Sequence, residues 1–271
     1  MSTKRVKLVV SYDGYDFCGW APQQGQRTVH GTLTEGLRRV SGVEIEITGA
    51  SRTDSGAHAK GQVCHFDDPH GLPVANFVRA LNDVLPYDIS VLSAVSVASD
   101  FHSRFCAQDR FYRFRILCGP RDPHRARHTW WYGRALDVDL MAKTAQAFEG
   151  EHDFVAFSQM VDHRANTVRT IRSISVRQVR DEVWVDVVGT AFVRGMMRRI
   201  AGSLFEVGRG YREPENITKL LAQRDRSRIK FPTLLPAHGL CLMRIRYGRH
   251  PFDHRQLKDN LDQNERQDNE E

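Results

Sequence analysis

Hydrophobic and polar residues follow two different periods along this chain of 271 residues. Alternating apolar and polar side chains, or short apolar runs, predict β-strands at residues 7–11, 43–48, 61–66, 89–97, 111–117, 171–179, 183–188 and 240–247. Helical spacing, such as that of Val29, Leu33 and Leu37 behind a capping Thr28, predicts helices at residues 28–40, 74–85, 139–148, 191–207 and 214–222. Because many strands are amphipathic, we expect an α+β fold with helices on one face of an antiparallel sheet.

A change in composition divides the chain. The linker at residues 118–128 is rich in Pro, Gly and Arg, and it separates an N-terminal half, residues 1–118, from a C-terminal half, residues 119–248. Residues 249–271 carry four Lys/Arg against seven Asp/Glu and few apolar residues. We therefore expect an acidic, polar tail that is disordered.

Charge and cysteine usage narrow the class of protein. Residues 1–248 carry 35 Lys/Arg and 26 Asp/Glu, a net charge of +9 that attracts polyanions such as nucleic acid, although a soluble basic enzyme is the plainer interpretation. The five cysteines are scattered without a CxxC pair, which argues against a disulfide framework or a zinc site. With no apolar run of 18 residues and no signal-like start, we expect a cytoplasmic protein without a membrane segment.

The stretch at residues 49–59, with the sequence GASRTDSGAHA, is the strongest candidate site. Its small residues allow a backbone to approach another backbone or a ligand closely. Asp54 stands two residues after Arg52, and a carboxylate beside a specific charge partner is a candidate functional group. The alternative is that Asp54 only forms a turn or caps a helix.

Several common chemistries do not fit this stretch. The chain has no paired carboxylate near Asp54 as in glycosidases, no GxSxG elbow and no Walker lysine loop. A metal site built from His58, Cys64 and His65 is disfavoured, because Cys64 and His65 are adjacent on a predicted strand and point to opposite faces. We therefore expect no metal.

Two other segments carry candidate binding residues. In the strand at residues 111–117, Arg110, Tyr112 and Phe114 share one face, so Tyr112 is either a tyrosine flanked by basic groups in a site or an ordinary core residue. In the helix predicted at residues 191–207, Arg194 and Arg198 are four apart. They form either part of a site or a solvated basic stripe.

Five stretches, in order, resemble the tRNA pseudouridine synthase A family over roughly residues 4–247. They are Tyr12-Asp13-Gly14 with Gly19-Trp20, Arg52-Thr53-Asp54 with His58-Ala59, Phe101-His102 with Arg110 and Tyr112, Ala191-Phe192-Val193 with Arg198, and His238-Gly239-Leu240. The resemblance implies a pseudouridine synthase fold, in which two ferredoxin-like halves join in one antiparallel sheet around a central cleft. It also implies homodimers that bind tRNA and use no cofactor.

The resemblance implies roles for single residues. Asp54 matches the catalytic aspartate, and Arg52 matches an arginine that helps to displace the target base from its stack. Tyr112 matches a tyrosine that packs against the uracil, and Arg198 matches a basic residue that pairs with the aspartate. We expect Arg104 and Arg110, close to the aromatic strand, to bind the substrate RNA.

The implied reaction fits what the chain contains. Isomerising uridine to pseudouridine exchanges an N1–C1′ bond for a C5–C1′ bond without redox change, and one carboxylate is enough as a nucleophile, at C6 or at C1′. A neighbouring guanidinium keeps such a carboxylate ionised. The family's targets are uridines 38 to 40 of the anticodon stem-loop.

The chain departs from the family pattern at some positions, and two alternatives to the implied function stay open. Thr190, Arg194 and Gly195 stand where the family usually has Asn and two His. These changes spare the catalytic set but bear on which uridines are modified. The alternatives are a non-catalytic RNA-binding module with the same basic, aromatic surface, and a synthase that acts on another RNA.

Overall fold

The computed structural model describes residues 4–159, 166–223 and 226–249. The chain forms two compact units. The first comprises Met1–Gln108 and Met243–Glu271, and the second comprises Asp109–Leu242. Helices and strands are mixed in both, so the predicted α+β class is confirmed.

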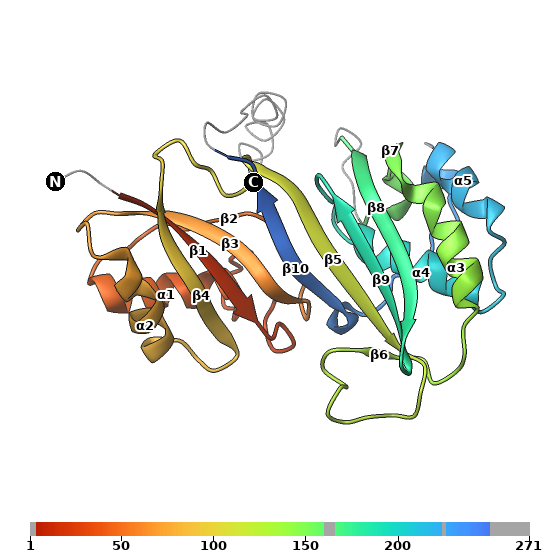
Figure 1. Ribbon diagram of the computed structural model, residues 1–271, viewed down its shortest axis with the longest axis horizontal. Coiled ribbons are helices and arrows are strands. Elements are labelled where there is room, and N and C mark those ends of the chain that lie inside the picture. The colour runs from red at the N-terminus through yellow and green to blue at the C-terminus, as the bar shows by residue number, and fades with distance from the viewer. Residues whose placement is uncertain (1–3, 160–165, 224–225, 250–271) are drawn as a thin grey trace. The chain divides into compact units, whose positions relative to one another are not determined.

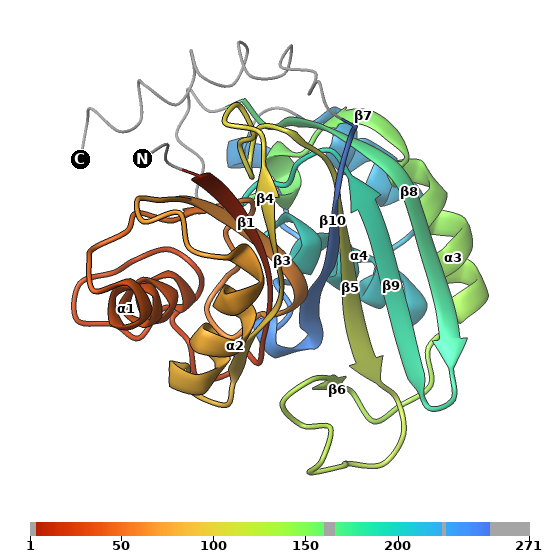
Figure 2. The same ribbon diagram turned by 60° about the vertical axis from the view of Figure 1, so that its left-hand side comes forward.

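The first unit is an antiparallel sheet with two helices. Strand β1 lies between β3 and β4 and is antiparallel to both, and the strand order is β4-β1-β3-β10. Helices α1 and α2 contact each other, and α2 contacts β4 (Figures 1 and 2). The elements are β1 (Lys4–Tyr12), α1 (Val29–Ser41), β2 (Thr48–Gly49), β3 (His58–Asp68), α2 (Val74–Val84) and β4 (Ile89–Val97), with the end of β10 (Leu240–Tyr247).

The predicted periodicity accounts for the core of this unit. Every second residue of β1 from Val6 to Tyr12 is buried, as expected for a strand with one face on the core. The helices cover that core with residues at helical spacing, among them Leu33, Leu37, Phe77 and Leu81. Thr28 caps α1 as predicted, because its side chain accepts a hydrogen bond from the Gly31 N–H.

The second unit repeats this plan. Its strands run in the order β5-β9-β8-β7, all antiparallel, and helix α3 packs on β8 and on α4 (Figure 1). The core includes Val183, Val185 and Val187 of β9 and Ile200 and Leu204 of α4. The elements are β5 (Ala107–Leu117), β6 (Trp130–Trp131), α3 (Val138–Ala145), β7 (Gly150–Asp153), β8 (Val168–Val179), β9 (Glu182–Gly189), α4 (Met196–Gly208) and α5 (Glu215–Ala222).

The compact units do not divide at the predicted linker. The change from one unit to the other falls between Gln108 and Asp109, inside β5. The linker is bound to the second unit instead: the Cys118 N–H donates to the Asp181 carbonyl over 2.8 Å, and the Arg125 guanidinium forms an ion pair with the Asp181 carboxylate at 2.7 Å. Composition showed that this segment lacks a helix or a long strand, but not what it packs against.

Two predicted elements are shorter than expected. Only Thr48 of the strand predicted at residues 43–48 pairs with β3, together with Gly49 that follows it. Ile45 and Ile47 are nevertheless buried, and Glu44 and Glu46 are exposed. An amphipathic pattern therefore persists without a ladder. Helix α4 begins at Met196 and not at residue 191, because Gly195 before it has a positive φ of 75°.

Other expectations concern the surface and the ends. All five cysteines are free. Within the described ranges, the structure contains no helix with the length and apolar character needed to cross a bilayer. The predicted acidic tail lies outside the described residues except for Arg249.

Candidate active site

The loop that carries Arg52 and Asp54 connects β2 to β3 in the first unit. Two backbone hydrogen bonds anchor its first part: the Ala50 N–H donates to the Val63 carbonyl over 2.8 Å, and the Trp20 N–H donates to the Thr53 carbonyl over 3.1 Å. Thr53 is buried, whereas Arg52 is exposed and Asp54 half-buried. The loop thus buries Thr53 and leaves accessible surface on the two charged residues beside it.

Glycines let another backbone segment approach this loop. A Cβ on Gly19, which has a φ of 85°, would lie 2.8 Å from the Thr53 carbonyl oxygen. A Cβ on Gly14 would lie 1.8 Å from the Ala57 carbonyl oxygen. Since neither atom fits, the segment after β1 requires glycine at both positions to pack on the loop.

A tight turn follows Asp54. The Ala57 N–H donates to the Asp54 carbonyl over 3.0 Å, and Gly56 supplies the positive φ of 81°. The Phe17 carbonyl accepts hydrogen bonds from the Gly56 N–H at 3.2 Å and the Ser55 hydroxyl at 3.3 Å. Asp54 therefore does take part in a turn, as the alternative interpretation expected, but through its backbone carbonyl.

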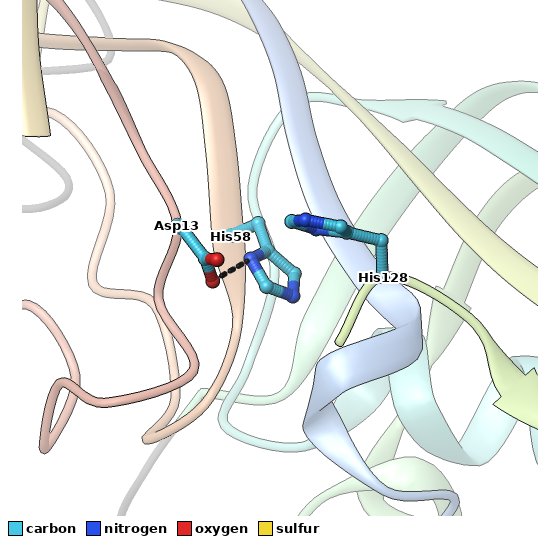
Figure 3. Close-up of side chains that lie close together, drawn as sticks. All are labelled: Asp13, His58 and His128. Atoms are coloured by element: carbon cyan, nitrogen blue, oxygen red, sulfur yellow. Dashed lines mark ion pairs between the residues drawn. The ribbon is translucent and has the colours of Figure 1, made fainter. Parts of the chain in front are cut away.

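His58, the first residue of β3, joins the end of the loop to the segment after β1. Its Nδ1 accepts a hydrogen bond from the Gly14 N–H at 3.0 Å and lies 3.1 Å from a carboxylate oxygen of Asp13 (Figure 3). His58 is only 4% exposed. It therefore holds the loop in place, a contribution that the motif alone did not reveal.

Arg52 does not hold Asp54 through an ion pair. In the part of the chain that the structure describes, the Arg52 guanidinium has no carboxylate within ion-pair distance. The expectation that this guanidinium keeps the carboxylate ionised therefore has no support from the geometry. The Arg52 residue is instead exposed.

Tyr112 belongs to the second unit. As predicted from the alternation of β5, Arg110, Tyr112 and Phe114 are buried, while Phe111 and Arg113 on the other face are half-buried. The Tyr112 ring meets the Phe192 ring edge to face, with the centroids 4.9 Å apart. Arg110 is 7% exposed and donates to the Thr190 carbonyl, so its guanidinium already has a partner inside the protein.

Arg198 is the third residue of α4. Its Nε donates to the Leu235 carbonyl over 2.6 Å, and the residue is half-buried, so it is not part of a solvated stripe. Arg194 precedes the helix, and its carbonyl accepts from the Gln159 N–H at 2.7 Å. The expectation that the two arginines share a helix face is therefore wrong, because α4 begins after Arg194.

Much of the positive charge around β5 is neutralised inside the second unit. Arg113 forms an ion pair with Asp186 at 2.6 Å, and Arg115 forms one with Glu182 at 2.7 Å. The Arg113 guanidinium also lies 3.9 Å from the centre of the Trp184 ring. In contrast, Arg104 in the first unit is exposed and lies 5.7 Å from the centre of the Phe105 ring.

The other residues weighed as metal ligands have different surroundings. Burial raises the pKa of the Cys64 thiol to about 12, which disfavours the thiolate that binds metals. His65 Nδ1 accepts a hydrogen bond from the Ser103 N–H over 3.2 Å. This hydrogen bond gives His65 a structural role in β3, and Cys64 is a buried core residue of the same strand.

Comparison with known proteins identifies the family. The family model described as tRNA pseudouridine synthase matches residues 8–106 and 144–248, which include Arg52, Asp54 and Arg198 but not Tyr112. The chain is 38% identical over 249 residues to the tRNA pseudouridine synthase A of Maridesulfovibrio salexigens, covering 90% of this chain and 91% of the relative. It is 39% identical over 245 residues to the Brevibacillus brevis protein of the same name, covering 90% and 100%.

Solved structures add little to this comparison. The archaeal box H/ACA sRNP Nop10–Cbf5 complex is 11% identical with a TM-score of 0.32, over 73% of this chain and 44% of that chain, which is too distant to carry an argument. The sequence relatives and the family model agree, and both span most of the chain. This chain belongs to the tRNA pseudouridine synthase family, whose members are isomerases that act on uridine in tRNA.

Proposed function

We propose that this chain converts uridine to pseudouridine at positions 38 to 40 of the tRNA anticodon stem-loop, with Asp54 as the nucleophile. The observation that carries the proposal is the loop at residues 50–57. It turns Thr53 inward, is fixed by backbone hydrogen bonds on both sides of Asp54, and leaves the Asp54 side chain half-exposed. A preorganised nucleophile on a rigid scaffold is what covalent catalysis needs.

The chemistry needs little else from the protein. The Asp54 carboxylate attacks either C6 of the uracil or C1′ of the ribose, and the N1–C1′ bond breaks. The uracil turns, C5 bonds to C1′, the carboxylate leaves, and the proton on C5 is lost to water while N1 gains a proton. Atoms and electrons balance without an oxidant or a reductant.

Other residues take their proposed roles from the family resemblance. Arg52, exposed and without an ion pair in the described residues, helps to displace the target base. Tyr112 packs against the uracil, and Arg198 pairs with Asp54. Arg104 and Arg110 bind the RNA, Arg104 from an exposed position and Arg110 from a buried one.

Tritium release tests this function. Transcripts of tRNA labelled at C5 of uridine lose tritium to water when pseudouridine forms, so wild type should release it and Asp54→Asn should not, while both bind tRNA. Turnover by Asp54→Asn would refute the role of Asp54. If wild type released no tritium from any tRNA, the substrate would be another RNA, or the chain would be a non-catalytic RNA-binding module.

Two further properties follow from the resemblance alone. We propose that the chain acts in the cytoplasm as a homodimer that binds tRNA. Light scattering of the purified protein should give about twice the chain mass of 31.0 kDa. A monomer mass at the concentration of the activity assay would contradict the dimer.

A further inference from the structure

A chain of buried polar side chains runs beneath the segment Arg52-Thr53-Asp54. The Tyr12 and Thr53 hydroxyl groups are hydrogen-bonded over 2.8 Å. The Gln62 amide nitrogen donates to the Ser51 carbonyl over 2.6 Å and to the Tyr12 hydroxyl over 3.4 Å. Three side chains from three parts of the first unit therefore meet under the loop.

The burial of these groups needs an explanation. Gln62 has no exposed surface, and Tyr12 and Thr53 are 4% and 8% exposed. Burying polar groups is unfavourable unless they are hydrogen-bonded, and apolar residues of similar size would fill the same space. A fully bonded polar network gains specific geometry, because it is satisfied in only one arrangement of its members.

The strands hold two members of this network in place. Tyr12 ends β1, where it pairs with Ala59, and Gln62 pairs with Val10 in the same ladder. The Tyr12 ring is packed against Phe17 and Trp20, with 6.4 Å between the ring centres in each case. The sheet thus fixes Tyr12 and Gln62, and these two residues in turn position the loop through their hydrogen bonds.

We infer that Tyr12, Thr53 and Gln62 are positioning residues that set the place of the Asp54 carboxylate, an inference that rests on the function proposed above. Thr53 is held at two atoms: its hydroxyl bonds to Tyr12, and its carbonyl accepts from the Trp20 N–H. That carbonyl belongs to the peptide bond that leads to Asp54. Rotation of this peptide, which would swing the carboxylate, breaks one or both bonds.

Gln62 restrains the backbone before the other charged residue of the loop, Arg52. The Ser51 carbonyl that it binds belongs to the peptide bond leading to Arg52. The network therefore holds the peptide bond before Arg52 directly, and it fixes the Thr53 side chain beside the carbonyl that the Trp20 N–H holds. Its effect on catalysis is indirect, through the backbone.

The expected kinetic effect is a loss of kcat. Misplacement of a catalytic group by about 1 Å lowers the rate on the order of 100-fold. Since none of the three side chains is exposed to bind RNA, we expect the KM for tRNA to stay within about twofold. A residue that only stabilised the fold would instead lower the melting temperature and leave kcat per folded molecule unchanged.

Thr53→Val keeps the shape of the side chain and removes the hydroxyl. We expect kcat for tritium release to fall at least tenfold, and Thr53→Ser, which retains the hydroxyl, to restore most of it. Thr144→Val is a matched control, because Thr144 is 6% exposed and its hydroxyl donates to the Leu140 carbonyl over 2.7 Å within α3. The inference is wrong if Thr53→Val retains the kcat of Thr144→Val.

A second variant keeps the test decisive if Thr53→Val folds poorly. Tyr12→Phe removes only the partner hydroxyl and leaves the ring, and it should lower kcat to a similar degree. Because the two substitutions break the same hydrogen bond, the double variant should be about as slow as the slower single variant. Independent effects that multiply would overturn the inference.

The Asp54→Asn variant separates this inference from the proposed function. If Asp54→Asn is inactive and Thr53→Val is fully active, the function stands and the positioning network does not. If Asp54→Asn turns over, Asp54 is not the nucleophile, and any loss of kcat in Thr53→Val must have another origin. Thermal melts of all variants show which of them are folded.

Discussion

Arg113 and Asp186 face each other across strands β5 and β9 and share two hydrogen bonds, of 2.6 and 2.8 Å. Their side chains are 15% and 12% exposed, and the Arg113 guanidinium also covers the Trp184 ring. Arg113 belongs to a strand that resembles an RNA-binding strand, but its guanidinium is already bonded to Asp186 within the second unit. The same holds for Arg115 and its partner Glu182.

The Arg113–Asp186 pair should contribute to stability. We expect Arg113→Gln to lower the free energy of unfolding by about 1–3 kcal/mol, because the mostly buried Asp186 then keeps only its longer contact, of 3.3 Å, with the exposed Arg177. Urea unfolding at low salt measures this. Arg38→Gln is the matched control: Arg38 pairs with Glu35, both half-exposed, and its loss should not change the midpoint.

Salt dependence should separate arginines that bind RNA from those that do not. Arg104→Gln should reduce the slope of log affinity for tRNA against log salt by about 1, because an exposed guanidinium that binds a phosphate releases one counterion. Arg115→Gln should leave the slope unchanged, since Glu182 already neutralises Arg115. Equal slopes for Arg104→Gln and wild type would remove Arg104 from the RNA interface.

Acid should destabilise the first unit through His65 and His102. Burial lowers the pKa of each imidazole to about 4 from its ordinary 6.5. Each Nδ1 also accepts backbone N–H bonds that a proton would break: His65 from Ser103 at 3.2 Å, and His102 from Arg104 and Phe105 at 3.2 Å. Both rings are therefore neutral in the folded protein.

The sign of the pH effect follows from these lowered pKa values. In the unfolded chain the two imidazoles take up protons below about pH 6.5, whereas in the folded chain they do so only near pH 4. The free energy of unfolding is therefore highest above pH 6.5 and falls as the pH is lowered toward 4. After allowance for solvent screening, we expect a loss of about 1–2 kcal/mol for each histidine. Unfolding curves at pH 7.5 and pH 5 measure the loss, which should be smaller in His102→Gln.

Gly14→Ala should strongly reduce activity by displacing the loop. The new Cβ would lie 1.8 Å from the Ala57 carbonyl oxygen, so the end of the turn that follows Asp54 must move. We expect kcat for tritium release to fall on the order of 100-fold. Gly31→Ala provides the comparison: Gly31 lies in the first turn of α1, its nearest neighbour is the Thr28 hydroxyl at 3.2 Å, and alanine favours helix there.

Local patterns predicted most of the elements. The strand at residues 89–97 and the strand at residues 240–247 have the predicted limits, and α1 begins behind Thr28 as expected. These predictions succeed because periodicity and caps depend on residues close in sequence. They are incomplete where the pairing of distant residues decides, as at residues 43–47, which have the strand pattern but form no ladder.

The sequence alone indicated the loop of Arg52 and Asp54 as a candidate site because the residues of this loop are contiguous. A lone carboxylate among small residues can be recognised in the sequence without knowledge of the fold. The glycine with positive φ in the turn after Asp54, Gly56, lies in the same short stretch. In contrast, the contribution of His58 was missed, because its partners Asp13 and Gly14 come from the preceding strand–loop segment. No spacing rule links residues that meet only after folding.

The sequence by itself determined the α+β class, the positions of most helices and strands, and the family, and it indicated the loop of Arg52 and Asp54 as a candidate site. Only the tertiary structure decided that Arg113 is bonded to Asp186, that Arg52 has no ion pair with Asp54, and that Tyr12, Thr53 and Gln62 meet beneath the loop. The physical reason is that hydrophobic alternation specifies which face of a strand is buried. It does not specify which strand lies alongside, and so it cannot say which buried polar groups become partners.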